Sequence, residues 1–112
     1  MSSLLEAQQK LTRLLPRLLD YIHLMGYEAT LGDAYRDPRV HGDWGVKASY
    51  SAAHSNHKRR LAIDLNLFKD GVYLTQTEDH RPIGEAWERL GGFWGGREND
   101  GNHYSIEFEG YW

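Results

Sequence analysis

The sequence predicts an α+β domain in which helices flank a small antiparallel sheet. Three observations predict it: a helical pattern over residues 3–25, a strand pattern over 60–68 that enters a hairpin turn, and a helix followed by a strand over 82–109. The chain of 112 residues is long enough for one domain, 1–112, with a helical segment at 1–26 and a core region at 27–112. Its 40% hydrophobic and 26% charged residues are typical of a globular protein.

The first element is an amphipathic helix over residues 3–25, in which leucines recur at spacings of three and four. Ser3 and Glu6 form a capping box, and Gly26 ends the pattern. Pro16 leaves two alternatives open, namely one kinked helix or a short lead-in followed by a helix over 16–25.

A strand is expected over residues 27–35, because Pro38 disfavours helix at the residue before it. The chain from there to Asn56 contains Gly and Ser and has no clear periodicity. Loops of this length in a compact domain are commonly functional, so we expect a functional loop here.

The clearest strand covers residues 60–68, where leucine and isoleucine alternate with Ala62, Asp64 and Asn66. Asp64 therefore faces away from the apolar core. Residues 69–71 form the turn of a hairpin, and a short strand follows at 72–74.

Pro82 begins a helix that ends at Leu90 before two glycines, and a glycine-rich segment then leads to a last strand over 103–109. His103 lies on the polar face of that strand by alternation. If the two polar-faced strands are neighbours in one sheet, His103 and Asp64 line a common surface.

Several functions are disfavoured by composition. Thirteen Lys and Arg against sixteen Asp and Glu give a net charge of −3 without a long basic block, so no nucleic-acid partner is expected. No segment is apolar over the length of a membrane span, and the N-terminus lacks the pattern of a secretory signal. The absence of cysteine excludes disulfides, thiolate zinc sites and a cysteine nucleophile.

A hydrolytic zinc site in such a chain needs three ligands from His, Asp and Glu and an open position for water. The candidates are His57, Asp64 and His103, with Asp100 as a general base. An acid at a fixed offset from one of six histidines is expected about once by chance, so this spacing alone is weak support. The strand alternation around Asp64 and His103 strengthens it.

Two motifs add a resemblance. Residues 55–64, SNHKRRLAID, resemble the S-x-H-x-x-G-x-A-x-D motif of the zinc D-Ala-D-Ala carboxypeptidase and L-alanyl-D-glutamate peptidase family, and residues 100–103, DGNH, resemble its second motif. Segments 65–71, 84–88 and 94–97 are similar to small bacteriophage members that serve as endolysins. Two departures are Arg60, in place of the motif glycine, and an Asp rather than Glu at position 100.

The resemblance implies a fold of the Hedgehog/DD-peptidase type, one zinc ion held by His57, Asp64 and His103, and Asp100 as the catalytic base. It places Arg36 where the family has an arginine that steadies the substrate carbonyl or oxyanion. Alternatively, Arg36 pairs only with a neighbouring acid. Two further residues are candidate substrate contacts with a structural alternative each: Ser55, which could cap a turn, and Trp94, which could wall the cleft. His54 is expected to be a solvated loop histidine rather than a fourth ligand.

The function implied is a zinc metallopeptidase that hydrolyses the stem peptide of bacterial peptidoglycan, as a phage endolysin that cleaves L-Ala-D-Glu bonds during host lysis. The alternatives are a D-Ala-D-Ala carboxypeptidase and a catalytically silent module that binds the cell wall. We expect a monomer without stable membrane association. Its location would be the host cytoplasm until lysis and the cell wall afterwards.

Overall fold

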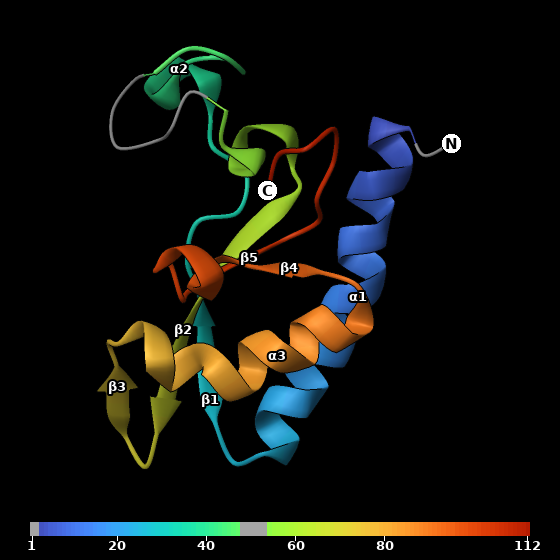
Figure 1. Ribbon diagram of the computed structural model, residues 1–112. Coiled ribbons are helices and arrows are strands. Elements are labelled where there is room, and N and C mark those ends of the chain that lie inside the picture. Colours follow the sequence, from blue (N-terminus) through green and yellow to red (C-terminus); the bar gives the residue numbers. More distant parts are fainter. Residues whose placement is uncertain (1–2, 48–53) are drawn as a thin grey trace.

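The computed structural model describes residues 3–47 and 54–112, and it is an α+β fold with an antiparallel sheet (Figure 1). The part of the expected long loop at 48–53 lies outside the described residues. None of the helices in the described ranges combines the length and the hydropathy that a bilayer crossing requires.

The longest helix, α1 (Leu4–Leu24), is continuous through Pro16, which decides between the two alternatives in favour of one helix. The predicted capping box between Ser3 and Glu6 is present at its first turn. Helix α3 (Arg81–Leu90) ends at Gly91, whose φ of 107° is in the left-handed region that suits glycine. The short helices are α2 (Pro38–His41), η1 (Asn56–Arg59), η2 (Thr77–His80) and η3 (Gly95–Glu98).

Strand β2 (Ala62–Lys69) organises the sheet, whose order is β1-β2-β5-β4 with β3 paired to β2. All described pairings are antiparallel. The first half of β2 pairs with β5 and the second half pairs with β1, so two chain segments far apart in sequence meet along one strand. The remaining strands are β1 (Glu28–Leu31), β3 (Val72–Leu74), β4 (Phe93–Trp94) and β5 (His103–Ser105).

Two predicted strands are too long. The strand expected over 27–35 ends at Leu31, although the backbone of Gly32 and Asp33 still bonds to Asp64 on β2. The strand expected over 103–109 ends at Ser105. Beyond it, Glu109 and Gly110 have φ values of 54° and 82° and turn the chain back on itself.

The hydrophobic core lies where α1 and α3 pack together and against the sheet (Figure 1). The core includes Ile63, Leu65 and Leu67 from the inward side of β2 and Leu61 from the position just before it, as the alternation predicts. Asp64 lies between them on the opposite side, which carries the site described next.

Candidate active site

His57 is held in place by its backbone and by one ring nitrogen. It lies on η1, where its backbone N–H donates to Ser55 Oγ at 3.2 Å, and its side chain is only 2% exposed. The ring Nδ1 lies 2.8 Å from Ala34 O. Because a carbonyl only accepts hydrogen bonds, Nδ1 carries a proton, and Nε2, which lies 3.1 Å from Asp64 Oδ1, is the ring nitrogen left to bind a metal ion.

Asp64 and His103 are directly opposite each other on β2 and β5, as their shared polar faces predicted. His103 Nδ1 is 3.8 Å from Asp64 Oδ1. One ligand atom from each of His57, Asp64 and His103 lies within 4.8 Å of the others. The structure therefore brings the three predicted ligands into one cluster.

This donor set fits a zinc ion. Zinc accepts imidazole nitrogen and carboxylate oxygen as ligands, and three of them leave the fourth position open. Burial, with the nearby His57, lowers the pKa of His103 to about 4, so its ring is neutral at pH 7. A neutral imidazole is the form that binds metal. The other ring nitrogen of His103, Nε2, is buried without a partner among the described residues.

Asp100 lines the same pocket, which has a volume of about 310 Å³ and also contains the three-residue cluster. Partial burial and the negative charge of Asp64 raise the pKa of the Asp100 carboxyl. Gly95 makes the approach of this loop to the site feasible, because a Cβ there would lie 2.4 Å from Asp100 O and 2.8 Å from His103 Cβ.

Arg36 lies at the pocket and contacts more than the acids beside it in sequence. Its Nε is 3.2 Å from Asp33 Oδ2, and its NH2 is 3.7 Å from Asp64 Oδ2. Its NH1 donates to Ser55 Oγ at 3.3 Å. Ser55 also caps η1, so the structure shows the capping alternative for this residue and places it on the pocket wall.

Arg60, at the position of the motif glycine, has a left-handed backbone conformation, which favours glycine. Its φ of 59° and ψ of 34° are left-handed, and it ends η1 just before β2. A residue with a side chain there costs roughly 1–2 kcal/mol relative to a right-handed conformation. The guanidinium lies 4.0 Å above the ring of Tyr35. The backbone at position 60 is therefore left-handed although the residue carries a side chain.

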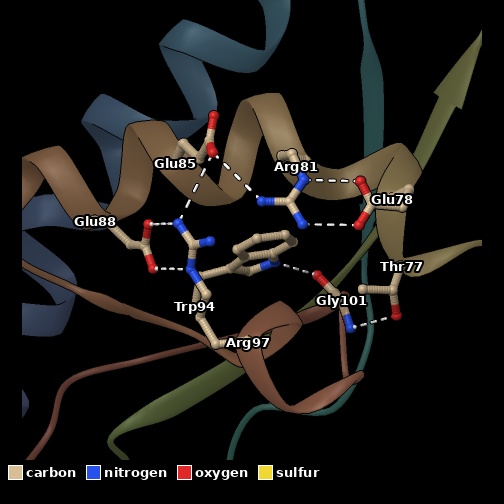
Figure 2. Close-up of polar contacts among 8 residues, drawn as sticks. All are labelled: Thr77, Glu78, Arg81, Glu85, Glu88, Trp94, Arg97 and Gly101. Atoms are coloured by element: carbon tan, nitrogen blue, oxygen red, sulfur yellow. Dashed lines mark hydrogen bonds and ion pairs between the residues drawn. The ribbon is translucent and has the colours of Figure 1, made fainter.

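Trp94 corrects a prediction, because it is fully buried and presents no surface to a substrate. Figure 2 shows its indole beneath Arg81 and Arg97, with the ring nitrogen bonded to Gly101. That Nε1–H donates to Gly101 O at 2.7 Å, while Gly101 N–H donates to Thr77 Oγ1 at 3.2 Å. Both peptide groups of the residue that follows Asp100 are thus fixed (Figure 2).

The same indole lies under a network of ion pairs (Figure 2). Arg81 pairs with Glu78 at 2.7 Å, and Arg97 pairs with Glu88 at 2.8 Å. Glu85 lies between the two arginines, at 3.5 and 3.8 Å. The network joins η3 to α3 and supports the loop that carries Asp100.

Trp112 lines the pocket instead, which the sequence did not reveal. It is 40% exposed and stacks on Phe93 with ring centroids 4.9 Å apart. His54 is exposed as expected, and it also lines the pocket while stacking on Tyr111 at 5.1 Å. The C-terminal segment returns here because Asn56 Nδ2 donates to Ile106 O and Tyr111 O, both at 3.0 Å.

Three ligands with an open fourth position and a carboxylate in the same pocket form the arrangement that hydrolytic metal centres use. A sequence model of the family described as D-alanyl-D-alanine carboxypeptidase matches residues 49–106. The match covers more than half of the chain and includes all three cluster residues and Asp100. The chain belongs to this family of peptidases, and so to the hydrolases. No curated protein matches the sequence.

Proposed function

We propose that the protein is a zinc-dependent peptidase that hydrolyses the stem peptide of bacterial peptidoglycan at L-Ala-D-Glu bonds, as a phage endolysin. The observation that carries this proposal is the cluster of His57, Asp64 and His103 in one pocket with Asp100, in a chain of the peptidase family. The similarity of segments 65–71, 84–88 and 94–97 to phage endolysins supports the finer assignment.

The proposed roles follow from the residues in the pocket. His57, Asp64 and His103 would hold the ion, which as a Lewis acid polarises the substrate carbonyl and lowers the pKa of water toward about 7. The Asp100 carboxylate accepts the proton of the attacking water and later returns it to the leaving amine. The Arg36 guanidinium faces the same pocket and would stabilise negative charge on the carbonyl oxygen, a contribution worth about 3–4 kcal/mol for a well-placed donor.

The activity for which the family is described favours a second candidate, a D-Ala-D-Ala carboxypeptidase. Such an enzyme needs a cation for the terminal carboxylate of its substrate. In the described part of this pocket, Arg36 is the one Lys or Arg side chain, and its proposed role is at the carbonyl oxygen of the cleaved bond, so the described lining has no second cation for a terminal carboxylate. This arrangement supports the endopeptidase over the carboxypeptidase.

Digestion of purified peptidoglycan, with mass spectrometry of the new termini, separates the candidates. We expect new D-Glu amino termini; loss of terminal D-Ala alone would contradict the endolysin proposal. Release of no peptide at all would favour the silent wall-binding module.

The metal and the base are tested separately. His57→Ala should abolish zinc binding in calorimetry, whereas Asp100→Asn should retain zinc and lose roughly 10²–10⁴-fold in kcat. Full activity after exhaustive chelation would contradict zinc dependence.

The remaining parts of the proposal concern the setting. We propose that the protein acts as a monomer without a nucleic-acid partner or stable membrane association. It would accumulate in the host cytoplasm and reach the cell wall at lysis. Fractionation of infected cells before and after lysis tests this location.

A further inference from the structure

A second cavity adjoins the proposed active site and shares one residue with it. This cavity, of about 250 Å³, is lined by residues 73–77, by His80 and by residues 99–102. Asp100 is the residue that lines both cavities. The second cavity therefore begins where the proposed general base lies, on the side formed by β3 and η2.

The side chains around the second cavity are rich in amides and hydroxyls. Gln76, Asn99 and Asn102 supply carboxamides, and Thr75 supplies a hydroxyl. Within the described ranges, no hydrogen bond engages the side-chain amides of Asn99 and Asn102, and Gln76 Nε2 has one long contact, 3.5 Å to Thr75 Oγ1. Such groups both donate and accept, which suits the amide groups of a peptide.

The cavity offers no positive charge. Neither Lys nor Arg is among its described lining residues. Burial lowers the pKa of His80 to about 4, and this neutral ring is bonded to Tyr104 through Nδ1 and the hydroxyl at 2.8 Å. A carboxylate bound there would give up hydration without gaining a Lys or Arg partner among the described lining residues, whereas a carboxamide would pair with the amides and hydroxyls.

The side of the substrate follows from the role of Asp100. A base that returns its proton to the leaving amine must lie within hydrogen-bond reach of that nitrogen. The peptide that continues from this nitrogen then extends past Asp100, away from Arg36 and the metal cluster. The second cavity shares Asp100 with the first and is lined by neither Arg36 nor any residue of the metal cluster, as this path requires.

We propose that this cavity binds the residue on the leaving-amine side of the cleaved bond and selects a carboxamide over a free carboxylate on that residue. The inference rests on the proposed peptidase function and deepens it. For cleavage after L-Ala, the preferred leaving residue is D-Glu whose α-carboxyl is amidated, rather than D-Glu with a free α-carboxylate.

Two synthetic stem peptides that differ only in this group test the proposal with the zinc-loaded enzyme. We expect kcat/KM to be about tenfold higher for the carboxamide peptide, because the carboxylate of the other peptide has no Lys or Arg partner among the described lining residues of the cavity. Gln76→Lys adds a cation to the cavity and should shrink or reverse the ratio. Gln9→Lys makes the same change on the exposed side of α1 and should leave the ratio unchanged.

The outcomes distinguish failure of the cavity proposal from failure of the proposed peptidase function. Equal cleavage of both peptides, or preference for the carboxylate, overturns the cavity proposal while the peptidase function stands. An unchanged ratio in Gln76→Lys also overturns it, because the added charge would then lie outside the binding site. If neither peptide is cleaved after L-Ala, the proposed function fails, and the cavity proposal fails with it.

Discussion

Gly84 on α3 provides a sharp test of the packing, because helix propensity and sterics predict opposite signs for one substitution. Inside a helix, Ala is more favourable than Gly by about 1 kcal/mol. A Cβ at Gly84 would, however, lie 2.1 Å from Trp94 Cδ2, and carbon atoms pack at about 3.5–4.0 Å. The indole would have to move by well over an ångström, and it is fully buried.

That movement has a cost that can be estimated. It would break the 2.7 Å bond from Trp94 Nε1 to Gly101 O, worth about 1 kcal/mol, and overpacking adds about 1–3 kcal/mol. After subtraction of the gain in helix propensity, Gly84→Ala should lower the free energy of unfolding by about 1–3 kcal/mol.

Urea titration followed by tryptophan fluorescence and circular dichroism measures this change, provided that the denaturant slope is unaltered. Arg89→Ala, at an exposed position of the same helix, is the matched control and should be within about 0.5 kcal/mol of the wild type. A Gly84→Ala protein as stable as the wild type, or more stable, would refute the packing argument.

Three further changes have expected outcomes. Thr77→Val removes the acceptor of the Gly101 N–H, so kcat/KM should fall about tenfold with zinc affinity unchanged, and Thr77→Ser should restore it; equal activity of both variants would contradict the argument. The pKa of His80 is lowered from 6.5 to about 4 by burial, so its stabilising contribution is complete above pH 6.5 and is lost as the pH falls toward 4. Between pH 6.5 and 4 the free energy of unfolding of the metal-free His80→Gln protein should therefore fall by up to about 3 kcal/mol less than that of the wild type. Urea titration at each pH measures this difference, and parallel pH profiles of the two proteins would contradict it. Asn56→Ala removes two 3.0 Å hydrogen bonds of a fully buried side chain and should lower the free energy of unfolding by about 2–3 kcal/mol. It should also raise the mobility of Trp112 in NMR relaxation; an unchanged Trp112 signal would contradict the role of Asn56 in holding the C-terminal segment.

The strand around Asp64 was predictable because a half-buried strand needs alternation, and alternation is visible in sequence. The same rule placed His103 on a polar face. In the structure the two residues are directly paired on neighbouring antiparallel strands. What the sequence could not provide was the pairing itself, which depends on contacts between segments about 40 residues apart. The resemblance to a family, not the spacing, selected these residues among the acids and histidines.

The positions of two tryptophans depended on local packing rather than on pattern: Trp94, a candidate substrate contact, and Trp112, for which no role was predicted from the sequence. Trp94 and Trp112 are both aromatic residues beside glycine or chain ends, yet one is buried and the other lines the pocket. Burial of Trp94 depends on glycines 84 and 96, which lack the side chains that would occupy its place. The return of the C-terminal segment to the pocket involves Asn56, whose partners lie 50 and 55 residues away, and Arg59, which pairs with Glu109 at 2.9 Å.

The left-handed residue Arg60 has a consequence for how such proteins are found. A motif written in letters treats this position as a mismatch, whereas the torsion angles of Arg60 are left-handed, a conformation that favours glycine. What the site requires at this position is a direction of the chain, and an arginine provides it at a modest loss of stability. A search that scored torsion angles rather than residue types would count position 60 as a match.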